Sequence, residues 1–214
     1  MDNQRVGDGR RPGLARYPVL VFFLLAYAIS WGGILAIVLP KGVPGQSEAV
    51  DALMAPVGLA MLAGPFVAGI AMSLMLGGRS GLAALFRGFM IWRVGWANFL
   101  FATCLIPACA LAILLPLSLI SPVYAPGFLG PGGGLAMIAF SLAGGFLVAL
   151  IEETGWTGFV TPRLVARHGV MAAAVLLGLV HGIWHFMSNS WFEGAEFGLV
   201  FLPYFLTAWI LAIV

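Results

Sequence analysis

Residues 135–153 read LAMIAFSLAGGFLVALIEE, an apolar run that ends in two adjacent carboxylates, Glu152 and Glu153. A helix rises about 1.5 Å per residue, so roughly 20 apolar residues cross about 30 Å of hydrocarbon. The run, which begins near Gly134, therefore predicts a transmembrane helix with two ionisable groups toward its end.

The rest of the chain has the same apolar character. It has 214 residues, of which 62% are hydrophobic and 8% charged, too few charges to cover a soluble core. Continuous runs of this kind exclude the short alternating strands of a β-barrel. The sequence predicts an all-α, polytopic membrane protein with about six transmembrane helices, the other five being Pro18–Leu39, Ala52–Leu76, Trp96–Ile120, Val170–Met187 and Phe197–Val214.

Basic residues orient the predicted helices, because positive charge near helix ends stays on the cytoplasmic side. All but Lys41 of the 10 basic residues lie before the first run, between the second and third, or between the fourth and fifth. We therefore expect a multi-pass protein of the cell (inner) membrane with a cytoplasmic N-terminus. A net charge of +2 distributed in this way indicates lipid contact and no nucleic-acid partner.

Three regions follow from the composition. Residues 1–16 are polar and predict a disordered cytoplasmic segment. Residues 17–133 hold the first transmembrane helices, with an amphipathic interfacial segment near 79–96 that mixes arginines with aromatic and aliphatic side chains. Residues 134–214 form the third region and contain the ionisable groups discussed next.

Ionisable side chains inside a membrane are costly and mark function by default. Besides the two glutamates, His181 and His185 lie within an apolar run. In an antiparallel hairpin that turns at residues 167–169, Glu152 and His185 each lie about 16 residues, or roughly 25 Å, from the turn. A continuous helix through Pro162 therefore places Glu152 opposite His185, and His181 near Trp156.

Adjacent helical residues differ by about 100° around the axis, so at most one glutamate points straight at the histidines. A carboxylate opposite two imidazoles suits a divalent metal, such as zinc, with a water to activate. Two other interpretations stay open. The four side chains can form hydrogen bonds that only pack helices, or a proton or ion pathway, although the restriction of charge to one hairpin disfavours the pathway.

The stretches EETGWTGFVTPRL, residues 152–164, and LLGLVHGIWHFMSN, residues 176–189, resemble the CPBP family of intramembrane CAAX prenyl proteases and bacteriocin-processing enzymes, also called the Abi family. The first family motif, EExxWRGxxxPxL, is matched at Glu152, Glu153, Trp156, Gly158, Pro162 and Leu164, and the second at Trp184 and His185. Thr157 replaces the motif arginine, and His181 replaces an aromatic residue. We expect His181 to fill that aromatic place in preference to acting as a ligand.

The resemblance implies an intramembrane metal-dependent endopeptidase acting on a peptide or membrane-protein substrate. In it, Glu152 activates water, Glu153 assists, and His185 binds the metal, with Glu152 and His181 as further candidate ligands. The third family motif, HxxxN, is absent from residues 134–214, and we expect this chain to end before the family's last helices. The alternative is a catalytically degenerate scaffold, or a bacteriocin-immunity-type protein, that binds a partner through the hairpin. Trp156 and Trp184 are expected to pack the hairpin.

Overall fold

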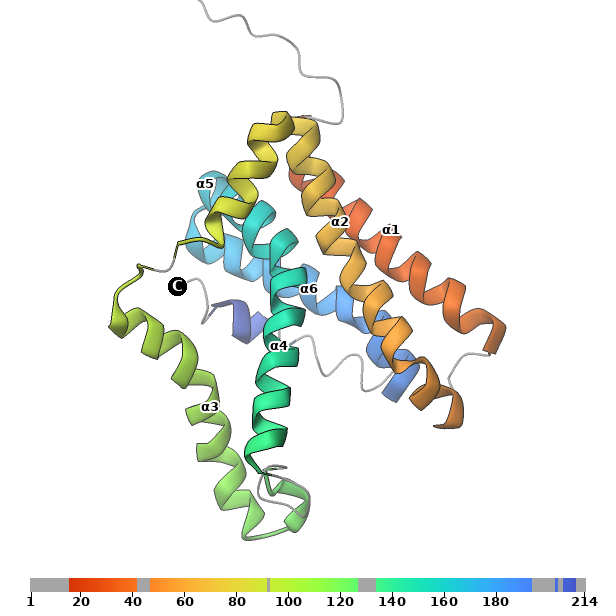
Figure 1. The fold of residues 1–214 in the computed structure, drawn as a ribbon, viewed down its shortest axis with the longest axis vertical. Helices are drawn as coiled ribbons and strands as arrows, with labels where there is room; N and C mark the ends of the chain where they lie inside the picture. The colour runs from red at the N-terminus through yellow and green to blue at the C-terminus, as the bar shows by residue number, and fades with distance from the viewer. Residues whose placement is uncertain are drawn as a thin grey trace, which may run out of the picture. The chain divides into compact units, whose positions relative to one another are not determined.

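A computed structural model describes residues 16–41, 47–91, 93–126, 134–193, 203 and 206–210. These residues contain no strand, which confirms the all-α prediction for the part of the chain that is described. The elements are α1 (Pro18–Val38), η2 (Leu39–Lys41), α2 (Ser47–Gly88), α3 (Trp96–Ser118), η3 (Pro122–Tyr124), α4 (Leu135–Gly155), η5 (Trp156–Val160), α5 (Thr161–His168) and α6 (Val170–Glu193) (Figure 1).

Five helical stretches in the described ranges are long and apolar enough to cross a membrane: Pro18–Lys41, Asp51–Gly88, Trp96–Ser118, Leu135–His168 and Val170–Ser188. They coincide with the first five predicted runs, so the chain is a multi-pass membrane protein. The sixth predicted run lies outside the described residues except for position 203 and for residues 206–210, which are helical. The predicted disordered segment also lies outside them, apart from Arg16.

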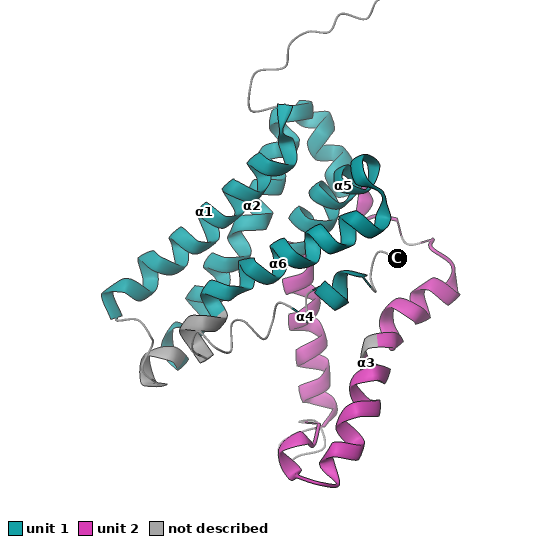
Figure 2. Cartoon of the chain, turned by 180° about the vertical axis from the view of Figure 1, so that it is seen from behind, with its two compact units in different colours: residues 1–86, 152–214 teal, residues 87–151 magenta. Residues whose placement is uncertain are grey.

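The chain divides into two compact units, and the first is assembled from both ends of the sequence (Figure 2). Unit 1 comprises Met1–Phe86 and Glu152–Val214, and unit 2 comprises Arg87–Ile151. All four ionisable candidates fall in unit 1, so the site is described within this unit.

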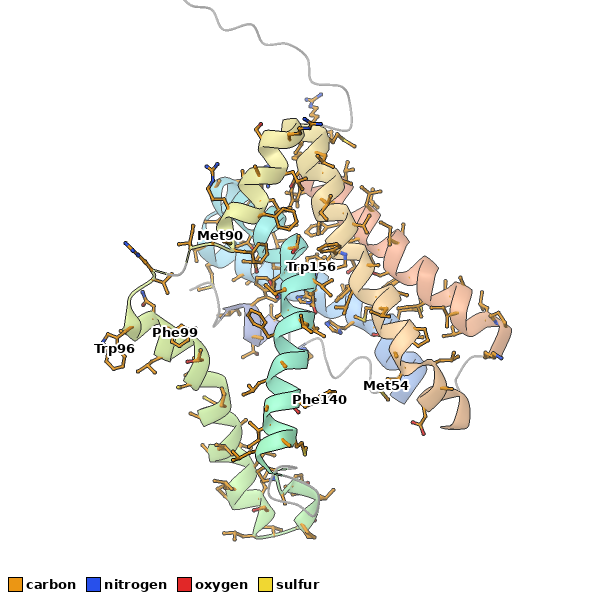
Figure 3. All side chains as sticks on the ribbon, viewed as in Figure 1. Met54, Met90, Trp96, Phe99, Phe140 and Trp156 are labelled. Atoms are coloured by element: carbon orange, nitrogen blue, oxygen red, sulfur yellow. The ribbon has the colours of Figure 1, made fainter. Side chains whose placement is uncertain are left out.

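Unit 2 contains α3 and most of α4, and both helices expose apolar side chains. Trp96 of α3 is 77% exposed and Phe140 of α4 is 81% exposed, and both point away from their helices (Figure 3). A helix satisfies its own backbone hydrogen bonds, so an exposed apolar face of this kind is stable in lipid.

In unit 1, α1 and α2 lie side by side and approach each other closely at a glycine (Figure 1). A Cβ atom at Gly64 would lie 2.3 Å from the carbonyl oxygen of Ala26, and Ser30 donates a 2.5 Å hydrogen bond to the carbonyl of Met61. Small residues let membrane helices pack backbone to backbone, and here they bring α1 and α2 into such contact.

The helix α2 is interrupted at Gly78, where φ is 56° and ψ is −145°. Only glycine adopts this conformation without strain, and the chain bends there before helix resumes. In the predicted interfacial segment near 79–96, α2 ends at Gly88 and α3 begins at Trp96. Residue Leu85 of this segment is 6% exposed and belongs to the core, so the part of the segment before Arg87 packs within unit 1 instead of only lying at an interface.

Candidate active site

The helix that carries the glutamates is not continuous, because a π-helical turn, η5, follows α4. Pro162 has no N–H to donate to the carbonyl four residues earlier, and its ring crowds that carbonyl. The helix widens instead: the backbone N–H of Thr161 bonds the carbonyl of Trp156, and the Thr161 hydroxyl donates to the same oxygen at 2.9 Å. Such π-turns are frequent at functional sites.

The prediction that Glu152 lies opposite His185 assumed a continuous helix through Pro162, and the π-turn interrupts that helix. A π-turn takes up about one extra residue, so Glu152 lies about 1.5 Å nearer to the hairpin turn than a regular helix would place it, which is only part of the roughly 6 Å between His185 and His181. Its Oε1 atom is 2.5 Å from Nε2 of His181 and 3.9 Å from Nε2 of His185. The direct partner of Glu152 is therefore His181, one turn before the predicted residue.

Glu152, His181 and His185 form a cluster in which one candidate ligand atom of each lies within 4.8 Å of the others. Their side chains are 13%, 5% and 20% exposed, respectively. The sequence predicted all three as members of one site, and the structure brings them together. The 3.9 Å distance between Oε1 of Glu152 and Nε2 of His185 is longer than an ordinary hydrogen bond but within the range of an ion pair.

Glu153, the second predicted glutamate, is not part of that cluster. Its carboxylate accepts a hydrogen bond from the hydroxyl of Thr157, one turn further along the same helix. The prediction that at most one glutamate points straight at the histidines agrees with this arrangement. Thr157 also gives the carboxylate a neutral donor at the position where the family motif has arginine.

An aromatic cluster surrounds the His181 ring. Trp156 stacks on it with ring centroids 4.9 Å apart, as the hairpin count predicted, and His185 stacks at 5.1 Å. Trp156 and Trp184 are both fully buried and lie edge to face at 5.5 Å, so both pack the hairpin as expected. His181 lies among aromatic rings, as expected for a residue that fills an aromatic place, and it also contacts Glu152.

The helix α1 holds the histidine helix through two hydrogen bonds that the sequence did not suggest. The hydroxyl of Tyr27 donates to the carbonyl of Val180 at 2.5 Å, and the indole N–H of Trp31 donates to the carbonyl of Trp184 at 2.9 Å. These carbonyls immediately precede His181 and His185 along α6. Tyr27 and Trp31 are four residues apart, so they share a helix face. This spacing is the one feature of the sequence that indicates a shared contact.

A second contact missed from the sequence comes from the last described residues. The indole N–H of Trp209 lies 2.7 Å from Nδ1 of His181, and Trp209 is only 7% exposed. A single tryptophan in an apolar run carries no signal that it reaches a histidine.

Glycines bring α2 against the helix that bears the glutamates. A Cβ atom at Gly155 would lie 2.3 Å from the carbonyl oxygen of Pro65 and 2.9 Å from Cζ of Phe22. A Cβ atom at Gly69 would lie 3.0 Å from Cα of Gly155. The backbones therefore touch directly beside Glu152 and Glu153, which sets the position of both carboxylates.

The fold and the site together define a multi-pass helical membrane protein with a buried carboxylate between two histidines. Residues 134–214 match the model of the family "Type II CAAX prenyl endopeptidase Rce1-like", which supports the CAAX protease family that the motifs predicted. The match covers both motifs and all four candidate site residues. No curated protein and no solved structure matches the chain.

Proposed function

We propose that this protein is an intramembrane endopeptidase in which Glu152 activates the attacking water. The observation that carries the proposal is the carboxylate of Glu152, held by the two histidines of α6 in a membrane-spanning hairpin, within the segment that matches a protease family. A membrane carboxylate with such partners is a candidate general base.

The reaction follows from the positions of these side chains. A water between Glu152 and His185 gives a proton to Glu152 as its oxygen attacks the carbonyl carbon of the scissile peptide. The tetrahedral intermediate then collapses, the C–N bond breaks, and Glu152 returns the proton to the leaving amine. His185 orients the water, and Glu153, held by Thr157, adds negative charge beside the base and assists it.

The predicted divalent ion, zinc, stays part of the proposal. The carboxylate of Glu152 and Nε2 of His185 are suitable donors, and the ion would supply a water that ionises near neutral pH. Catalytic zinc sites usually have three protein ligands, and His181 is the third candidate in the described part of the chain. Its Nε2 atom faces Glu152, and its Nδ1 atom is already engaged.

The substrate is a peptide or a membrane protein cleaved near a lipid anchor or a helix end, because only such a bond reaches a site inside the hydrocarbon layer. The protein is proposed to lie in the inner membrane with its N-terminus in the cytoplasm, as the positions of the basic residues indicate. Exclusion of bulk water by the helices restricts hydrolysis to bonds that enter laterally.

The test uses the full chain, with any native extension, purified in detergent. Cleavage of a farnesylated CAAX peptide and of the same peptide without the lipid is compared for wild type, Glu152→Gln and His185→Ala. His168→Gln is the matched control, because His168 is the remaining histidine and lies at the exposed end of α5. Loss of a general base lowers kcat by about 100-fold or more, so Glu152→Gln and His185→Ala should be nearly inactive.

Zinc content measured on the same preparations tests the metal. Stoichiometric zinc in wild type and His168→Gln, lost in His185→Ala, supports a metal-dependent reaction. Equal cleavage by wild type and Glu152→Gln rules out the proposed base. Absence of cleavage in every preparation, with all of them equally stable, favours the scaffold function instead.

A further inference from the structure

The two ring nitrogens of His181 contact different kinds of hydrogen-bonding group, a donor at Nδ1 and a carboxylate at Nε2. The indole N–H of Trp209 is 2.7 Å from Nδ1, and the Glu152 carboxylate is 2.5 Å from Nε2. An indole N–H can only donate, so Nδ1 accepts and carries no proton. A neutral imidazole has one N–H, which therefore lies on Nε2 and donates to Glu152.

This arrangement is the reverse of that around a metal-bound histidine. A ligating histidine usually donates its second N–H to a carboxylate, a carbonyl or water, which leaves the other nitrogen to bind the metal. Trp209 offers Nδ1 a donor where an acceptor would be needed. Binding of a cation at Nε2 would remove the proton there while Trp209 keeps Nδ1 unprotonated, so the two contacts exclude each other for a neutral ring.

The contact between Trp209 and His181 is built into the packing of unit 1. Gly178, three residues before His181, allows the backbone of Leu206, three residues before Trp209, to approach: a Cβ atom at Gly178 would lie 2.6 Å from Cα of Leu206. The His181 ring is also held by Trp156, stacked on one side. These contacts leave the ring little room to turn over and exchange its two nitrogens.

We propose that Trp209 fixes His181 as an Nε2–H donor, which makes His181 a positioning residue for Glu152 and not a metal ligand. The positioning role rests on the proposed function, whereas the location of the proton on the ring does not. The cation site, where one is used, then draws on Glu152 and His185 and on no atom of His181.

The proton position can be measured without any activity. The full chain is labelled with ¹⁵N-histidine, and the one-bond and two-bond ¹H–¹⁵N couplings of its three histidines are recorded in detergent micelles. His168→Gln and His185→Gln assign the signals. We expect His181 to show a protonated Nε2 and an unprotonated Nδ1, and Trp209→Phe, which keeps the ring but removes the donor, to shift the Nδ1 signal. A protonated Nδ1 in wild type, or signals unchanged in Trp209→Phe, overturns the proposal.

Metal content and kinetics test the second half of the proposal. His181→Gln keeps an N–H donor near the position of Nε2, and His181→Phe keeps a ring without a donor. We expect His181→Gln to hold as much zinc as wild type, and to keep a kcat about tenfold above that of His181→Phe with KM similar in both. Loss of zinc in His181→Gln but not in His168→Gln identifies His181 as a ligand and overturns the proposal. Equal kcat in the two His181 variants would overturn the positioning role, even if the ¹H–¹⁵N couplings show the expected protonated Nε2.

Discussion

Replacement of Gly155 by alanine tests whether backbone contact between α2 and the glutamate helix sets the site. The new Cβ atom would lie 2.3 Å from the carbonyl oxygen of Pro65 and 2.7 Å from its carbonyl carbon. An ordinary carbon–oxygen contact is about 3.3 Å or more, so the two backbones must separate by about 1 Å. No flexible side-chain end is available to move in place of the Pro65 backbone.

The expected loss of stability follows from two opposing effects. Alanine favours helix over glycine by roughly 0.5–1 kcal/mol, whereas overpacking of a tight contact costs typically 1–3 kcal/mol and occasionally more. With backbone opposing the new methyl group, the cost lies at the upper end of that range, and we expect a net loss of about 2–2.5 kcal/mol. For a chain of this size, that lowers Tm by roughly 4–10 °C.

Thermal unfolding in detergent, followed by intrinsic tryptophan fluorescence, measures this effect, with Gly144→Ala as the control. Gly144 lies in the same helix, and a methyl group added there would have no atom within 4 Å, so its replacement should leave Tm unchanged or raise it slightly. Equal or higher Tm for Gly155→Ala would show that the contact is not as close as described. If Tm falls in both variants, α4 is destabilised by an added methyl group wherever it is placed, and the argument from the close contact at Gly155 is refuted.

Three further substitutions probe other contacts of unit 1. Tyr27→Phe removes the hydrogen bond to the carbonyl of Val180 and should lower the free energy of unfolding by about 0.6–1.5 kcal/mol, measured by the same thermal assay, with no change if the bond is absent. Leu85→Ala leaves a cavity in the core and should cost about 2–5 kcal/mol in that assay; a cost under about 1 kcal/mol would contradict its burial. Thr157→Val removes the donor to Glu153, and its peptidase kcat should fall about tenfold relative to Thr157→Ser, which keeps the hydroxyl; equal kcat values would show that the bond plays no part.

Much of the architecture could be predicted because its causes are local. The length of an apolar run decides whether it spans a membrane, and the five runs in the described residues became helices, although α2 continues to Gly88, well past the predicted end at Leu76. Helical periodicity likewise predicts that Glu152 and Glu153 point in different directions. In the structure Glu152 contacts His181, whereas Glu153 accepts a hydrogen bond from Thr157. Counting residues to the hairpin turn also placed His181 near Trp156, and the two rings stack in the structure.

Details of the site depended on contacts between distant parts of the chain. A proline inside a helix indicates a disturbance at Pro162, but it predicts neither that a π-turn forms there nor that His181 is the histidine in direct contact with Glu152. Tyr27 contacts the histidine helix at Val180, which lies 153 positions later in the sequence. Trp209 contacts it at His181, which lies 28 positions earlier. Sequence spacing within one helix carries no information on such pairs.

The sequence by itself determined that this is a helical membrane protein with a carboxylate and two histidines gathered on one hairpin, because hydrophobic length and helix periodicity act within a single segment. Only the tertiary structure decided that His181 contacts Glu152 directly and receives the N–H of Trp209. The contact with Trp209 depends on the packing of a separate helical segment against Gly178, and therefore on contacts that form only when the whole unit is assembled.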